Sequence, residues 1–140
     1  MKALVILAVL LGVIAMLLPR TFSTTDLQPS ARSVALNFAV FRNAANLYAQ
    51  KSKPSGIIPQ SALELPSGWK PLRSWVARVE SGCCYVYGPA SGEEIASARV
   101  LFQGSLAVGQ ASGSLLIPDG KTPVPSFVPS GCLLSVVGIN

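Results

Sequence analysis

The sequence contains no histidine, and only 12% of its residues are charged. Without histidine there can be no Ser-His-Asp triad, no Cys-His dyad and no histidine ligand for a metal ion. A typical soluble domain has about 25% charged residues, so this chain has few groups for acid–base chemistry. Its six acidic residues are scattered along the sequence. We therefore expect a protein that is not an enzyme, with no catalytic residues, no metal, no cofactor and no small-molecule substrate.

Cysteine is also scarce, with Cys83 and Cys84 adjacent and Cys132 alone. Neither the ligand spacing of a zinc site nor a redox Cys-x-x-Cys motif is present. In an exported domain the natural use of cysteine is a disulfide. Because neighbouring strand residues point to opposite faces, only one of the adjacent pair can face Cys132. We favour Cys84–Cys132; Cys83–Cys132 and three reduced thiols remain as alternatives.

The chain begins with an apolar run from Ala3 to Leu18, preceded by Lys2 and ended by Pro19 and Arg20. A membrane-spanning helix needs about 20 apolar residues, so the run is at the short limit. The residues expected at a signal-peptidase site are large instead of small. We therefore expect an uncleaved signal anchor. A cleaved signal peptide and a buried core helix are the alternatives.

This interpretation places the protein in the bacterial inner membrane as a single-pass protein, with its C-terminal domain in the periplasm. The predicted parts are a transmembrane anchor (1–20), a polar linker (21–29) and one periplasmic domain (30–140). Nucleic acid is not an expected partner of such a domain. The membrane is an expected partner, which the protein contacts through its N-terminal helix.

The pattern of the domain predicts an α+β fold. Ser30 is a plausible helix N-cap, and apolar residues then recur at spacings of three and four, which is one helical face. They are Val34, Phe38, Phe41, Ala45 and Tyr48. This amphipathic helix should end near Lys51–Pro54, with a loop from Pro54 to Pro71 after it.

The remainder indicates a small antiparallel sheet of four or five strands with a short second helix. Two strand-like runs, 75–80 and 83–87, flank Ser81-Gly82 and predict a β-hairpin. Ser91 and Glu94 have capping-box spacing and predict a helix ending near Gly104. Further strands are expected at 106–108, 115–117 and 132–137, the last apolar on both faces and therefore central.

Basic residues outnumber acidic ones between positions 31 and 80, and the net charge of the chain is +5. They could form a surface for an acidic partner or for anionic lipid headgroups, although solvated charges on an ordinary surface would give the same pattern. The predicted partner-binding residues are Arg32, Arg42, Lys51, Lys53, Lys70, Arg73 and Arg78.

The whole layout resembles the PilM family of type IVb and conjugative thin pili. The likeness comprises the short N-terminal anchor, the aromatic-striped helix FAVFRNAANLYA, the GIIP and LPSGW segment and the C-terminal β region. The resemblance implies a non-enzymatic component of pilus biogenesis, in the basal body or pilin transport, whose partners are other pilus assembly proteins. It carries over no catalytic residue and leaves the oligomeric state open.

Two other functions compete with this one. A minor pilin or pseudopilin also has a long helix before a loop and a sheet, but its leader is cut after a glycine, with a glutamate close behind. Here Gly12 is the only glycine of the apolar run and no acid follows it there; Pro19 and Pro29 would also interrupt a continuous helix. A free periplasmic binding module would require cleavage near Thr21.

Overall fold

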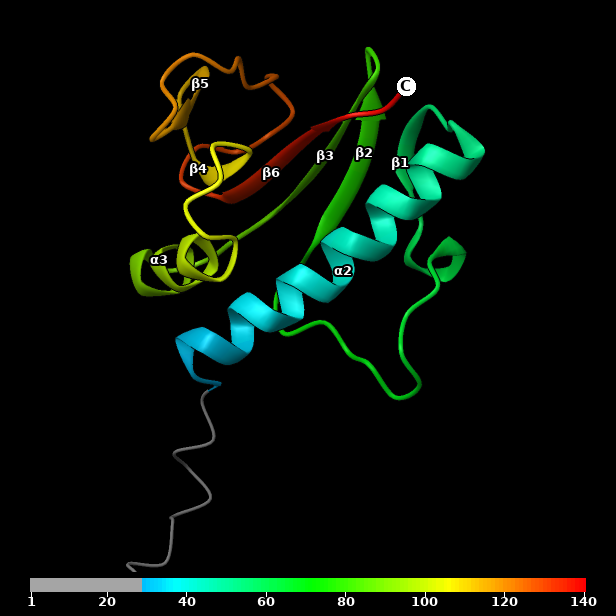
Figure 1. Cartoon of the computed structure of the whole chain (residues 1–140), viewed down its shortest axis with the longest axis horizontal. Helices are drawn as coiled ribbons and strands as arrows, with labels where there is room; N and C mark the ends of the chain where they lie inside the picture. Colours follow the sequence, from blue (N-terminus) through cyan, green and yellow to red (C-terminus); the bar gives the residue numbers. More distant parts are fainter. Residues whose placement is uncertain (1–28) are drawn as a thin grey trace, which may run out of the picture.

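A computed structural model describes residues 29–140, beginning with the predicted amphipathic helix, α2 (Ala31–Ser52) (Figure 1). The hydroxyl of Ser30 accepts a hydrogen bond from the Ser33 amide at 3.1 Å, which confirms the predicted N-cap. The apolar stripe faces the core, with Phe38 and Phe41 at most 2% exposed. The helix ends at Lys53, whose backbone is left-handed and whose amide donates to Ala49.

The helix packs against an antiparallel sheet of six strands in the order β1-β2-β3-β6-β4-β5. The predicted four or five strands were too few, because a three-residue edge strand lies in the segment expected to be a loop. The bounds are β1 Gly56–Ile58, β2 Val76–Glu80, β3 Cys83–Gly88, β4 Val108–Ser112, β5 Leu115–Ile117 and β6 Leu133–Gly138. β6 lies between β3 and β4, as its two apolar faces predicted.

The predicted hairpin is β2 and β3. Val79 faces Cys84 and Glu80 faces Cys83 across the ladder. Ser81 and Gly82 both have positive φ, 51° and 76°, as a two-residue type I′ turn requires. The strand expected at 106–108 begins instead at Val108, because Leu106 lies in the preceding turn.

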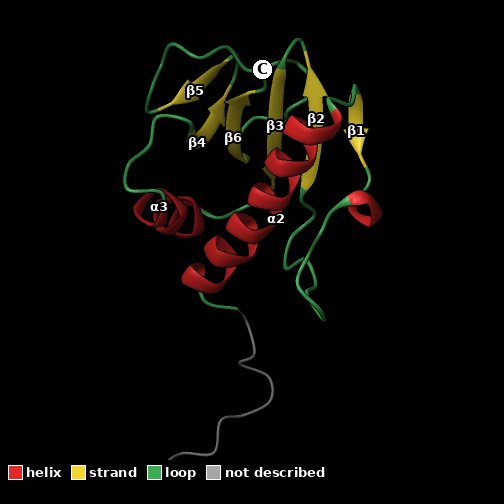
Figure 2. Ribbon diagram, turned by 45° about the vertical axis from the view of Figure 1, so that its right-hand side comes forward, coloured by secondary structure: helices red, strands yellow, loops and turns green. Residues whose placement is uncertain are grey.

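The two faces of the sheet are covered differently. α2 lies across one face, and α3 (Gly92–Leu101) packs beside it (Figure 2). Phe38 joins these layers, with its ring 5.1 Å from that of Trp75 and 6.4 Å from that of Phe102. The opposite face is covered by the segment between β5 and β6, where Phe127 packs on Tyr85 at 5.5 Å.

The second helix begins with the predicted capping box. The Ser91 hydroxyl accepts from the Glu94 amide, and the Glu94 carboxylate accepts from the Ser91 amide. A short 3-10 turn, η2 (Gln60–Ala62), packs near the C-terminal half of α2. Thus the α+β class is confirmed. The predicted N-terminal anchor lies outside the described residues, and no helix within 29–140 is long and apolar enough to span a membrane.

Candidate interaction surface

The structure does not gather the seven predicted basic residues into one surface. Arg42, Arg73 and Arg78 are half-buried and contact groups of their own chain. Arg32, Lys51, Lys53 and Lys70 are exposed. Arg32 and Lys51 belong to opposite ends of α2, roughly 28 Å apart at the helical rise. The seven residues therefore do not form one continuous surface, because the helix separates these charges and the fold uses three of them internally. Partner binding by the individual residues stays a prediction.

Arg73 is the most firmly engaged of the three internal arginines. Its guanidinium binds both carboxylate oxygens of Glu94, at 2.9 and 3.3 Å. Glu94 is only 5% exposed, and one of its oxygens also accepts the capping bond of Ser91. This arrangement fixes the loop before β2 to the start of α3. It leaves the Arg73 guanidinium occupied within the fold.

Arg42 and Arg78 are held by aromatic rings. Arg42 donates to the buried hydroxyl of Ser135 at 2.7 Å, with its guanidinium carbon 4.6 Å from the centre of the Phe102 ring. Burial lowers the pKa of Arg42, which nonetheless remains a cation. Arg78 lies 4.1 Å from the centre of the Phe127 ring on the other face of the sheet. Cation–π contact and packing of the stem account for both positions.

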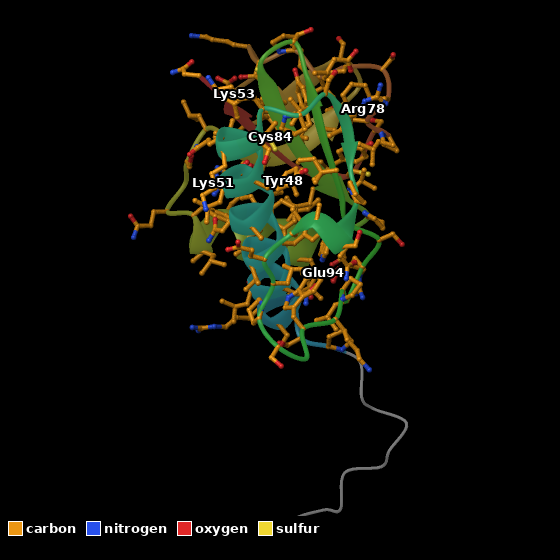
Figure 3. All side chains as sticks on the ribbon, turned by 90° about the vertical axis from the view of Figure 1, so that its right-hand side faces the viewer. Tyr48, Lys51, Lys53, Arg78, Cys84 and Glu94 are labelled. Atoms are coloured by element: carbon orange, nitrogen blue, oxygen red, sulfur yellow. The ribbon has the colours of Figure 1, made fainter. Side chains whose placement is uncertain are left out.

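The exposed cations at the C-terminal end of α2 have a different setting. Lys51 and Lys53 project from the last turn, and Figure 3 shows them well away from Glu94. Lys51 lies at the edge of a groove of about 310 Å³ between this end of the helix and η2. The groove is lined by Ala44, Leu47, Tyr48, Lys51, Ser52, Ala62 and Glu64.

This groove has the character of a protein-binding surface. Leu47 is 63% exposed although it is large and apolar, and Tyr48 presents part of its ring to the same hollow. Aromatic anchors surrounded by polar groups are typical of interface centres. One lysine and one glutamate border the groove, so a partner can be oriented by charge. We define this feature as the distal groove.

The sequence-based reasoning missed Leu47 and Asn37. Leu47 could have been found, because a leucine outside the stripe of an amphipathic helix has no core to enter. The Asn37 carbonyl oxygen accepts from the Leu72 amide and the Trp75 indole, and its amide donates to the Lys70 carbonyl. These bonds hold the loop after η2 against α2. No sequence signal singled Asn37 out, because its partners lie more than 30 positions away.

The predicted disulfide between Cys84 and Cys132 is not formed, and all three cysteines are free. Cys84 faces α2, whereas Cys132 lies in the cluster on the other face. Cys84 pairs with Val137 in the ladder, which is five positions from Cys132, or roughly 17 Å along the strand. Cys83 shares a face with Cys132 but pairs with Gly138, which is farther still. A disulfide needs Cα atoms within about 7 Å, so the register excludes both pairings.

The described residues also show how several acids are used. Asp119 accepts from the amide and hydroxyl of Thr122, and these bonds lower the pKa of its carboxyl group. Glu80 lies 3.6 Å from the Arg78 guanidinium. Within residues 29–140, no three Cys, Asp or Glu side chains are grouped so that they could hold a metal ion. Asp26 lies outside the described residues.

Comparison with known proteins gave two matches. A family model described as PilM matches residues 5–136. A crystal structure of a PilM protein from Escherichia coli B7A superposes with a TM-score of 0.58 and 16% sequence identity, covering 86% of this chain and 100% of that one. At this identity the likeness shows a shared fold. No curated protein matched the sequence.

Proposed function

The chain belongs to the PilM family, and from this premise we propose that it is a non-enzymatic component of the type IV pilus biogenesis apparatus at the bacterial inner membrane. Membership makes it a pilus-related protein. Its role in the basal body or in pilin transport is exerted by contact with other pilus assembly proteins. The apolar run from Ala3 to Leu18 holds it in the membrane, with the α+β domain in the periplasm.

The observation that carries this proposal is the distal groove. It combines an exposed leucine, a half-buried tyrosine and a flexible cation on the last turns of a rigid 22-residue helix. A helix packed on a sheet holds such a groove in a fixed shape, so little conformational entropy is lost when a partner binds. Lys51 lies at the edge of the groove and Lys53 follows at the C-cap of α2, and the two cations steer an acidic partner toward this end of the helix.

The test is complementation of a strain that lacks this gene. Lys51→Glu with Lys53→Glu should abolish pilus assembly while leaving the fold intact, because surface changes usually cost within about 0.5 kcal/mol each. The matched control is Lys70→Glu with Lys121→Glu, which reverses the same number of charges at exposed positions outside the groove. Normal pilus assembly by the first variant would contradict the proposal.

A second set of variants tests for catalysis. Glu80, Glu93 and Asp119 are each changed to the matching amide. Glu64 and Glu94 are left unchanged, because Glu64 lines the distal groove and Glu94 holds Arg73 and the cap. Pilus assembly should survive every change. Loss of assembly in one variant that stays folded, membrane-bound and partner-bound would show that the protein is an enzyme.

A further inference from the structure

A second groove lies at the other end of α2, between its first turns and the last turn of α3. Its volume is about 300 Å³, and it is lined by Arg32, Ala35, Ser97, Val100, Leu101 and Gln103. We define it as the proximal groove, because α2 begins here. The distal groove, by contrast, is lined by Ser52, the last residue of α2.

The proximal groove is bordered by exposed apolar side chains. Val100 is 79% exposed and Leu101 is 38% exposed, and Leu106 in the following turn is 60% exposed. Three large apolar side chains facing solvent within seven positions are unusual, because single exposed residues are normal but grouped ones indicate an interaction surface. α3 ends beside them, in a left-handed turn through Gln103 and Gly104.

The one charged side chain that lines this groove is positive. Arg32 lines the groove, and Arg99 lies on the last turn of α3. Arg99 is the only charged residue between Ile95 and Pro118. Arg99 is half-buried, and its Nε is buried without a hydrogen-bond partner among the described residues. Exposed aliphatic side chains flanked by arginine, without an acid among the lining residues, have the chemistry that binds anionic membrane surfaces.

The chain itself brings this end of the domain to the bilayer. Residues 19–29 connect the apolar run to α2, and fully extended they span at most roughly 40 Å. The first turn of α2 contains Arg32 and no acidic residue. In the anchored state proposed above, this tether joins the domain at the end where α2 begins, so this end is the part of the domain closest to the anchor along the chain.

We propose that the proximal groove rests on anionic lipid headgroups. Val100 and Leu101 enter the boundary between headgroups and acyl chains, and Arg32 and Arg99 face the phosphates. This contact sets the orientation of α2, so that the distal groove points away from the bilayer toward the assembly partner. The inference depends on the anchored state proposed above, although it concerns a different surface.

The experiment uses the full chain reconstituted in vesicles of phosphatidylcholine with or without phosphatidylglycerol, both containing brominated lipid. An environment-sensitive fluorescent amino acid replaces Val100 in one protein and Leu47 in the other. With phosphatidylglycerol, the probe at position 100 should show a blue shift and a loss of intensity through quenching. The probe at position 47 should show neither, because the distal groove faces away.

Two further variants make the result specific. Arg32→Glu with Arg99→Glu should remove most of the quenching at position 100, and Arg32→Gln alone should reduce it less. Circular dichroism checks that each remains folded. Equal quenching at positions 100 and 47 in a carbonate-resistant protein would overturn the lipid contact alone. Release of the chain by carbonate would contradict the membrane anchor, and the lipid contact with it.

Discussion

The two ends of α2 carry grooves of almost the same volume, about 310 and 300 Å³, but of different chemistry. The distal groove is lined by a tyrosine, a lysine and a glutamate. The proximal groove has aliphatic side chains and arginine, with no acid among its lining residues. Mixed charge with an aromatic anchor suits a protein partner of defined shape, whereas aliphatic residues with arginine suit a fluid anionic surface.

The difference teaches how one rigid helix can serve two neighbours. Phe38 and Phe41 pack its middle against the sheet, so that neither end can turn independently. The basic stretch in the sequence does not show this separation of the two ends, because it contains cations that belong to different ends of α2. The internal arginines are part of the frame that holds the ends in place, and they do not belong to either groove.

The largest expected effect comes from a substitution in the middle of α2 that should loosen both ends of the helix at once. Phe38→Ala removes a ring that is 0% exposed and contacts Trp75 and Phe102, so the free energy of unfolding should fall by about 3–5 kcal/mol. Leu47→Ala is the control on the same helix and should change the free energy of unfolding by about 0.5 kcal/mol or less. Urea unfolding of the purified full chain measures both. A small effect of Phe38→Ala would mean that the helix is not fixed by this packing.

A smaller loss of stability is expected from Arg73→Met, and it should affect the start of α3 but not the distal end of α2. Arg73→Met leaves the buried Glu94 carboxylate without its cation, and we expect a loss of about 1–3 kcal/mol, moderated by the partial exposure of Arg73. Hydrogen exchange should accelerate at Ile95 of α3 and remain unchanged at Lys53 beside the distal groove. Adding Glu94→Gln should recover part of the loss, since the amide carbonyl still accepts the Ser91 bond. An equal acceleration at both ends would show that the salt bridge acts on the whole domain.

The smallest effect concerns the middle of the helix, where Cys84 lies beneath α2. Burial raises the pKa of the Cys84 thiol to about 11 from 9.0, so the folded protein keeps it protonated at pH values where the unfolded chain ionises. This contribution to stability is complete below about pH 9 and is lost as the pH rises toward 11. The slope is at most about 1.4 kcal/mol per pH unit.

Tyr85 and Tyr87 also have pKa values raised by burial, so the wild-type decline must be compared with that of Cys84→Ala. The variant should lose stability less steeply between pH 9 and 11. The comparison of thermal midpoints across this range measures the difference. Parallel curves for the two proteins would mean that Cys84 ionises as readily in the folded state as in the unfolded one.

Local patterns predicted most of the fold. The stripe of α2, its Ser30 cap, the Ser81-Gly82 hairpin and the capping box of α3 all depend on residues a few positions apart, and the structure confirms each. β1 was missed because a strand of only three residues, Gly56–Ile58, carries no periodic signal. The disulfide prediction failed because strand alternation gives the face of a cysteine but not its register along the ladder.

The candidate surface was less predictable than the fold. The sequence shows that Arg42 and Arg73 are basic, but only the tertiary arrangement supplies Ser135 and Glu94 as their partners. Conversely, Val100 appears in the sequence as an ordinary apolar residue of a helix, and its exposure depends on which face α3 turns toward the sheet. Leu47 is the exception, because its position outside the apolar stripe of α2 already indicates exposure. Long-range packing therefore decides which charges and which apolar residues are available to a partner.

The most direct test of the central claim is site-specific photocrosslinking in cells that assemble the pilus. A photoreactive amino acid is placed at Leu47 in one strain and at Val100 in another, and the adducts are identified by mass spectrometry. We predict that position 47 captures one defined pilus assembly protein and that position 100 does not. Assembly of normal pili without any protein adduct at position 47, or capture of the same protein at both positions, would contradict the division of labour between the two ends of α2.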